Sequence, residues 1–286
     1  MPELPEVQAL ADFLGEQATG RTIQRVELAA ISALKTFDPP LDALAGRTIA
    51  GTGRRGKHLL IDTGDLWLVI HLARGGWVKW VENFSPKPAK PGRGPLALRV
   101  RLAGGGGFDV PEAGTEKRLA VWVARDPDDI DNVATLGPDP LDPVFDVDAF
   151  AAVLGATGSQ IKGVLIDQRQ IAGVGNAYSD EALHLAKLSP FRPANKLTVD
   201  EVAALHAALQ HVLRDAVERS SGVPAQGLKS EKKSGMRVHG RTGEKCPECG
   251  DVVREVSFAT KSLQYCATCQ TGGKPLADRR LSRLLK

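Results

Sequence analysis

Residues 246–269 read CPECGDVVREVSFATKSLQYCATC, a segment in which two Cys-x-x-Cys pairs are separated by 16 residues. This spacing lets four thiolates reach one tetrahedral zinc ion. A redox pair would need only one Cys-x-x-Cys, and four thiolate ligands leave no open coordination position for catalysis. The sequence therefore predicts a small finger that holds one structural Zn²⁺ ion through Cys246, Cys249, Cys266 and Cys269.

The segment between the two cysteine pairs predicts a β-hairpin. Residues 252–258 alternate between apolar and polar side chains, and a second short run follows at 261–265. Lys261 lies at the expected tip, where a lysine suits contact with a nucleic-acid groove. The spacing is equally compatible with a lysine that is simply solvated.

Charge is unevenly distributed along the 286 residues, although the net charge is only +3. Residues 226–286 contain 13 Lys or Arg and 6 Asp or Glu, a net charge of +7, which leaves −4 for residues 1–225. The basic end is the candidate contact for a polyanion. The alternative is a solvated, lysine-rich tail. Residues 278–286 place three leucines on one face of a basic helix, and we expect this tail to pack on the finger; gripping DNA and binding a partner are the alternatives.

Composition excludes several classes of protein. Apolar residues make up 42% and charged residues 25% of the chain, which is ordinary for a globular protein and argues against wholesale disorder. We find no run of roughly 20 apolar residues and no basic segment followed by an apolar one. The sequence predicts a cytoplasmic monomer without membrane contact.

Short alternating or apolar runs fill the N-terminal half and predict strands of a β-sandwich or barrel. Residues 4–18 are the exception and predict a helix, and the four glycines 104–107 predict a hairpin loop. We assign residues 1–135 to an N-terminal domain. The runs are at 57–62, 66–72, 77–81, 96–102 and 119–124.

The second half is predicted to be helical. Residues 136–143 are rich in Pro and Asp and mark a linker, which we extend to 136–149. Thr198 and Glu201 have capping-box spacing and open a helix to about residue 218. Residues 220–234 predict an exposed, mobile loop. Other helices are expected near 148–154, 159–169 and 177–186, giving a helical domain over 150–235, the finger over 236–272 and a basic tail over 273–286.

Three histidines lie within the predicted helices. None has a metal-ligating residue near it in the sequence, so we interpret them as ordinary structural or surface residues. They are His184, His206 and His211.

The chain begins Met1-Pro-Glu-Leu-Pro-Glu-Val7. A small second residue permits removal of Met1, which would expose the secondary amine of Pro2. Such an amine is a nucleophile that can attack an electrophilic sugar carbon in Schiff-base chemistry. Taken alone, an N-terminal proline is more often just the start of a chain.

Residues 2–7 closely resemble the start of the formamidopyrimidine-DNA glycosylase and endonuclease VIII family. Residues 54–57 resemble its lysine-bearing turn, and residues 167–181 resemble its helix-two-turn-helix. Together with the finger, these segments cover nearly the whole chain in the expected order. The resemblance implies an α+β fold: an N-terminal β-sandwich with a leading helix, then a helical helix-two-turn-helix domain with a zinc hairpin finger.

The resemblance also implies a function in base excision repair on damaged DNA, in association with the nucleoid. A bifunctional DNA glycosylase and abasic-site lyase would excise oxidised bases through a Schiff base on Pro2 and cleave the strand by β- or δ-elimination. Pro2, Glu3 and Lys57 would be the catalytic residues: Glu3 as the general acid, and Lys57 in contact with a phosphate near the lesion and assisting proton transfer. Glu6 would support the leading helix, and Asn176 would contact a second phosphate.

The sequence departs from the family where the flipped base leaves a gap. Its methionine-bearing loop is replaced by residues 71–76, and residues 109–118 stand where an Arg-Arg-Phe-Gly segment is usual. Arg74 and Arg118 are therefore the candidate gap-filling residues, and the preference for oxidised guanine does not carry over. Lys261 replaces the usual finger arginine and loses its planar fork.

Two other functions remain open at this point. A non-catalytic or lyase-only protein that binds abasic or distorted DNA would explain the altered gap-filling residues. A zinc module that binds RNA or protein explains only the C-terminal part.

Overall fold

The computed structural model describes residues 1–92, 94–258 and 262–277. It divides into two compact units. The first contains residues 1–136 and 219–229, and the second contains 137–218 and the described residues from 230 onward.

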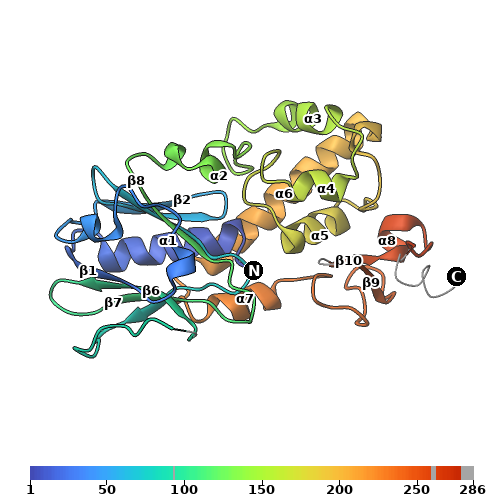
Figure 1. Cartoon of the computed structure of the whole chain (residues 1–286). Coiled ribbons are helices and arrows are strands. Elements are labelled where there is room, and N and C mark those ends of the chain that lie inside the picture. The colour runs from blue at the N-terminus through green and yellow to red at the C-terminus, as the bar shows by residue number, and fades with distance from the viewer. Residues whose placement is uncertain (93, 259–261, 278–286) are drawn as a thin grey trace, which may run out of the picture. The chain divides into compact units, whose positions relative to one another are not determined.

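Two antiparallel four-stranded sheets and a leading helix, α1 (Leu4–Ala18), form the first unit (Figure 1). The predicted β-sandwich with its helix is confirmed, and five of its strands fall within two residues of the predicted bounds. One sheet has the order β1 (Ile23–Leu28), β6 (Leu96–Leu102), β7 (Gly107–Pro111), β5 (Lys79–Val81), and the other has the order β2 (Gly51–Arg55), β3 (His58–Asp62), β4 (Trp67–His71), β8 (Ala120–Ala124).

Helix α1 contributes one stripe of side chains to the main core. Val7, Leu10 and Leu14 recur at helical spacing and are fully buried. Strand β3 is buried on both faces, because Leu59 packs in this cluster while Leu60 packs in a second cluster on the opposite face. This explains why β3 is a continuous apolar run with little alternation.

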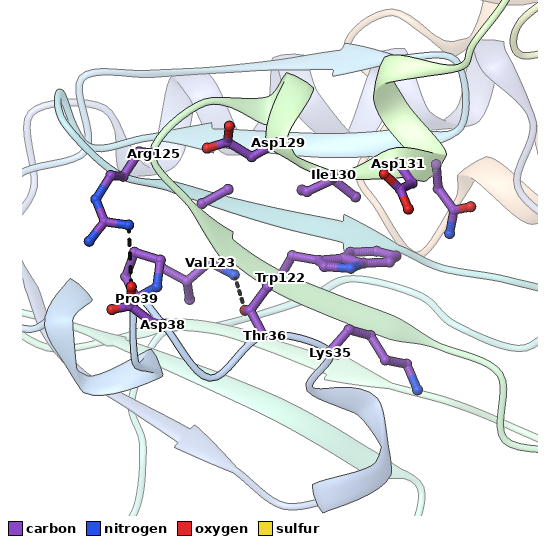
Figure 2. Close-up of a pocket in the computed structure, with 12 residues that line it drawn as sticks. Lys35, Thr36, Asp38, Pro39, Trp122, Val123, Arg125, Asp129, Ile130 and Asp131 are labelled. Carbon is purple, nitrogen blue, oxygen red and sulfur yellow. Dashed lines mark hydrogen bonds and ion pairs between the residues drawn. The ribbon is translucent and has the colours of Figure 1, made fainter.

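A small pocket lies over strand β8 on the outer side of its sheet. Two short helices, η3 (Pro127–Asp129) and α2 (Asp131–Ala134), form one wall, and residues 35–39 form the other (Figure 2). The pocket has a volume of about 400 Å³ and a lining of mixed charge over the indole of Trp122. None of the predicted site residues lines it.

Residues 220–234 do not form the predicted exposed loop. Ala225 and Leu228 are fully buried in the core of the first unit, and the indole N–H of Trp77 donates to the carbonyl of Ala225 at 2.8 Å. Leu228 begins helix α7 (Leu228–Ser234). The prediction was wrong because lysines and serines dominate the composition of the segment. The two apolar residues that anchor it in the core are three positions apart and form no recognisable pattern.

The second unit is helical and ends in a hairpin finger, as predicted. The expected capping box at the start of α6 is present, since Glu201 N donates to Thr198 Oγ1 and Thr198 N donates to the Glu201 carboxylate. The elements of the second unit are α3 (Val147–Gly155), α4 (Ile161–Ile166), α5 (Asn176–Leu185), η4 (Ala194–Lys196), α6 (Val199–Ser220), β9 (Val253–Ser257), β10 (Ser262–Cys266) and α8 (Ala267–Thr271).

Among the described residues, no helix has both the length and the apolar character needed to cross a membrane.

Candidate active site and metal centre

Two buried carboxylates lie at the start of α1, directly after Pro2. Glu3 is 2% exposed and Glu6 is 1% exposed. They form a capping box, in which Glu3 N donates to the Glu6 carboxylate at 2.8 Å and the Glu3 side chain accepts from the N–H of Glu6. The helix dipole also favours negative charge at this end. Glu6 therefore restrains the backbone of Glu3 and, through it, the neighbouring Pro2.

Lys57 lies at the tip of the β2–β3 hairpin. Arg55 pairs with His58, so Gly56 and Lys57 form a two-residue turn. Gly56 has a φ of +53°, in the left-handed region that glycine enters without strain. The lysine is 7% exposed and is thus part of the folded structure of the turn.

Helix α1 and strand β2 run in opposite directions, as two hydrogen bonds show. Thr52 Oγ1 donates to the carbonyl of Ala11 at 2.6 Å, and Arg54 Nε donates to Gln8 Oε1 at 2.9 Å. Moving along β2 toward the hairpin tip therefore means moving toward the start of α1. The structure brings Lys57 to the end of α1 that carries the two carboxylates.

Two uncharged histidines lie beside this turn. The rings of His58 and His71 are 4.9 Å apart. Burial lowers the pKa of His58 to about 4 and that of His71 to about 3, and the positive charge of Lys57 contributes in the same direction. Near neutral pH both rings are neutral, so Lys57 is the cationic member of this group.

The structure joins the segments that carry Arg74 and Arg118. Ala113 N donates to the carbonyl of Gly75 at 2.9 Å, and a Cβ at Gly75 would lie 2.1 Å from the carbonyl oxygen of Ala113. The Glu112 carboxylate, 3% exposed, accepts from the backbone N–H of Arg118 at 2.7 Å. Both arginines are exposed. Glu112, which the sequence analysis did not single out, closes the second segment on itself. The bond between Ala113 and Gly75 holds that segment against the first.

Asn176 is the first residue of α5 and is partly exposed. Its carbonyl oxygen accepts from Lys162 Nζ at 3.2 Å. Lys162 is itself buried and also donates to Asp180 at 2.6 Å and to Ser179 Oγ at 2.8 Å. A buried ion pair therefore supports the start of the helix that carries the candidate phosphate ligand.

The turn before α5 is held by one side chain. Gln168 Nε2 donates to the carbonyl of Val174 at 2.8 Å, and Gln168 Oε1 accepts from Gly173 N at 3.0 Å. Gly173 has a φ of +86°, which favours glycine. The amide thus uses both of its polar atoms to hold the turn in front of Asn176.

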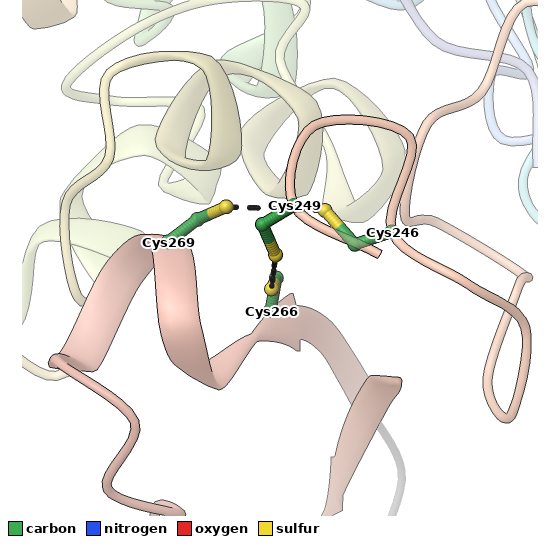
Figure 3. A group of neighbouring side chains, drawn as sticks. All are labelled: Cys246, Cys249, Cys266 and Cys269. Atoms are coloured by element: carbon green, nitrogen blue, oxygen red, sulfur yellow. Dashed lines mark hydrogen bonds between the residues drawn. The ribbon is translucent and has the colours of Figure 1, made fainter. Parts of the chain in front are cut away.

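The four cysteines gather at one point of the finger (Figure 3). All four sulfur atoms lie within 4.8 Å of one another, with 3.9 Å between Cys246 and Cys269 and 3.4 Å between Cys249 and Cys266. Zn–S bonds of about 2.3 Å in a tetrahedron place sulfur atoms about 3.8 Å apart, so this donor set fits zinc. Burial raises the pKa of Cys266 to about 11 and also raises that of Cys269. A bound cation would offset that effect by stabilising the thiolates.

The interpretation of His184 as an ordinary histidine without a metal-ligating neighbour is wrong, because the folded chain places it beside one. Its Nε2 lies 3.2 Å from the sulfur of Cys246, a residue 62 positions later in the chain. His206, by contrast, contacts the carbonyl of Phe145 at 3.1 Å within the helical core, as expected of a structural histidine. The predicted tip residue Lys261 and residues 278–286 of the basic tail lie outside the described residues.

Three domain families match successive parts of the chain. The formamidopyrimidine-DNA glycosylase N-terminal domain matches residues 1–110, the formamidopyrimidine-DNA glycosylase H2TH domain matches 136–226, and the zinc finger found in FPG and IleRS matches 243–272. The formamidopyrimidine-DNA glycosylase of Moorella thermoacetica is 36% identical over 264 residues, which cover 90% of this chain and 94% of that protein. This chain belongs to the formamidopyrimidine-DNA glycosylase family.

Two further similarities extend this result. An uncharacterized formamidopyrimidine-DNA glycosylase-like protein of Mycobacterium tuberculosis is 61% identical over 151 residues, covering 53% of this chain and 94% of that protein. The Lactococcus lactis Fpg in complex with DNA containing an abasic site has a TM-score of 0.83 and 27% identity, covering 94% of this chain and 99% of that one. The predicted family and fold class are confirmed.

Four residues that support the site were missed by the sequence analysis. Lys162 stands in the apolar run 161–166, and a lysine there is a signal that a buried partner is needed. The other three carry no comparable local signal, since their partners lie in other elements or across a turn. They are Glu112, Gln168 and His184.

Proposed function

We propose that this family member is a DNA glycosylase of base excision repair that also cleaves the strand at the resulting abasic site. The main support is the start of α1, where Pro2 precedes two buried carboxylates and the Lys57 turn lies at the same end. A protein that only binds DNA has no need of a nucleophile followed by an acid. The zinc ion would be held by the four cysteines, and its chemistry there is to cross-link the finger.

The nucleophile is the secondary amine of Pro2 after removal of Met1. Its nitrogen forms a bond to C1′ of the damaged nucleotide, and the bond from C1′ to the base breaks, with its electron pair leaving on the base, which takes up the proton that the nitrogen loses. Glu3 donates a proton to the ring oxygen of the sugar, so that the ring opens and an iminium remains on C1′. Because Glu3 is adjacent to Pro2 and restrained by Glu6, its carboxyl reaches the same sugar.

Strand cleavage follows from that iminium. Loss of a proton from C2′ neutralises the iminium charge, and the electrons displace the phosphate on C3′ in β-elimination. Lys57 contacts a phosphate near the lesion, and the neutral His58 beside it does not compete for that anion. Asn176 offers donors to a second phosphate at a helix start, where the dipole favours anions.

Arg74 and Arg118 fill the gap left by the flipped base. Their segments are joined by the bond between Ala113 and Gly75, and the Glu112 carboxylate fixes the backbone of Arg118, which supports a common role for the two arginines. Displacing a stacked base requires a side chain in its place, and an arginine plane can stack on neighbouring bases.

Borohydride trapping tests this proposal. The Met1-processed protein, verified by mass spectrometry, is incubated with duplexes carrying an abasic site or one of several oxidised bases. We expect a covalent adduct with both kinds of duplex, none for Pro2→Gly and a strongly reduced amount for Glu3→Gln. Glu16→Gln, on the exposed part of the same helix, is the matched control and keeps full trapping.

The competing function is a lyase-only or non-catalytic protein that binds abasic or distorted DNA, which the altered gap-filling residues favour. An adduct with the abasic duplex alone supports the lyase-only alternative. Tight binding with no adduct on any duplex refutes the enzyme and leaves a binding protein.

A further inference from the structure

His184 is buried beside the metal centre, in contact with Cys246. It lies near the end of α5 and is 1% exposed, and Cys246 is 2% exposed. The 3.2 Å between His184 Nε2 and Cys246 Sγ is within the range of an N–H···S hydrogen bond. The histidine comes from the helical part of the unit and the cysteine from the finger.

The surroundings of the ring determine which nitrogen carries the proton. His184 Nδ1 is buried and has no hydrogen-bond partner among the described residues. A proton on Nδ1 would therefore have no acceptor, while the lone pair of Nε2 would face a thiolate. A proton on Nε2 instead gives the sulfur a donor. The geometry favours the Nε2–H tautomer.

The same helix holds the finger through two other residues. The Glu181 carboxylate accepts from the backbone N–H groups of Arg237, Val238 and His239, at 2.8, 3.0 and 2.8 Å. Asp180 contacts His239 Nδ1 at 2.8 Å. Both acids are buried, and both contacts lie in the segment that leads into the finger. His184 adds a contact to the metal ligands themselves, one helical turn further along.

We propose that His184 donates a hydrogen bond to the zinc-bound thiolate of Cys246 and so makes α5 the support on which the metal centre is retained. The bond draws charge from the sulfur, which makes the thiolate a poorer target for protons and oxidants. It also ties the zinc site to the helix whose first residue is Asn176. This inference depends on the zinc centre and not on the glycosylase chemistry.

The first test uses the unaltered protein. Nitrogen-15 chemical shifts of the histidine rings in the zinc-loaded full chain distinguish the two tautomers of His184. We expect a protonated Nε2 and an unprotonated Nδ1. In the cadmium-113 form, a scalar coupling between the Nε2 proton and the metal would report the N–H···S–Cd path directly. An Nδ1–H tautomer overturns the proposal, whatever the variants do.

The second test compares variants of the full chain. His184→Phe keeps a ring without a donor, and His184→Gln keeps an N–H near the position of Nε2. We expect His184→Phe to release zinc to a chromophoric chelator about tenfold faster than the wild type, as for other residues that hold a metal ligand. In the cobalt form, its thiolate-to-metal charge-transfer band should move to lower energy. His184→Gln should restore both properties toward wild type.

His206→Phe is the matched control, because His206 is also on a helix of this unit but its Nε2 contacts the carbonyl of Phe145 in the helical core. It should leave zinc release and the cobalt spectrum unchanged. If His184→Phe folds, keeps the wild-type spectrum and retains zinc as well as the control, the histidine only fills space and the proposal is wrong. Abasic-site trapping by the zinc-loaded wild type is a separate measurement, so failure of either hypothesis is recognised independently.

Discussion

Replacing Lys162 by methionine should destabilise the second unit strongly. The Lys162 side chain is 9% exposed and its partner Asp180 is 1% exposed, with 2.6 Å between Nζ and Oδ1. Methionine fills about the same volume, but among the described residues it leaves the buried carboxylate of Asp180 with His239 Nδ1 and Gln264 N as partners, at 2.8 and 3.3 Å. Breaking a buried ion pair costs about 3–5 kcal/mol, and the two remaining contacts place this change near 3 kcal/mol.

The distribution of aromatic residues allows each unit to be followed separately. All four tryptophans lie in the first unit and both tyrosines lie in the second, which also holds most of the helix. Urea unfolding is followed by helical circular dichroism and by tryptophan fluorescence. With an m-value of about 2 kcal/mol per M, the loss of about 3 kcal/mol lowers the circular-dichroism midpoint by about 1.5 M. The tryptophan transition should move far less.

The paired variant shows whether the cost comes from an unpaired charge. Asp180→Asn combined with Lys162→Met removes both charges, and the double variant should recover at least half of the stability lost in Lys162→Met. If the single variant loses less than about 1 kcal/mol, or the two substitutions act additively, the reasoning from a buried charge is refuted. An interaction other than the buried ion pair would then have to support the start of α5, where Asn176 lies.

Three further predictions concern the first unit and the finger. Burial lowers the pKa of His58 to about 4 from about 6.5 in the unfolded chain, so its stabilising effect is complete above pH 6.5 and is lost as the pH falls toward 4. Urea titrations followed by tryptophan fluorescence should show that the wild type loses about 2 kcal/mol more than His58→Phe between pH 7 and pH 5; equal losses would exclude this effect. Gly75→Ala and Glu112→Gln should each reduce trapping on base-bearing duplexes more than on abasic ones, because both loosen the surface that carries the arginines. Equal reduction on both substrates would show that the surface has no part in base displacement. Chelation of zinc should abolish DNA binding measured by fluorescence anisotropy and zinc should restore it, whereas binding that survives verified metal loss would remove the finger from the interface.

Local signals were sufficient for several elements. Helix α1 begins and ends at the predicted residues, because Glu3 and Glu6 have capping-box spacing and the buried stripe recurs at helical intervals. The cysteine spacing was sufficient for the metal centre. In α1 the interacting residues are close in sequence. In the metal centre, four cysteines at this spacing allow few structures other than a metal site.

Strand β2 shows why other elements were missed. Its sequence, GTGRR, contains two glycines and no apolar side chain. It forms a strand because β3 pairs with it along its full length and Thr52 bonds to the backbone of α1. Neither partner can be deduced from the five residues themselves. The buried segment at Ala225 was missed for the same reason, since Trp77, which donates a hydrogen bond to the Ala225 carbonyl, lies 148 positions away in the sequence.

Two of the missed residues of the second unit concern the same helix, α5. Lys162 supports the first turn of α5 through Asn176 and Asp180, while His184 contacts the metal ligands from its last turn. The ten residues of α5 therefore connect a candidate phosphate ligand to the zinc centre. If the helix is rigid, Lys162→Met should weaken phosphate contact without releasing zinc, and His184→Phe should release zinc before phosphate contact is lost. Such a separation would mean that α5 positions both sites but that each site keeps its own local support.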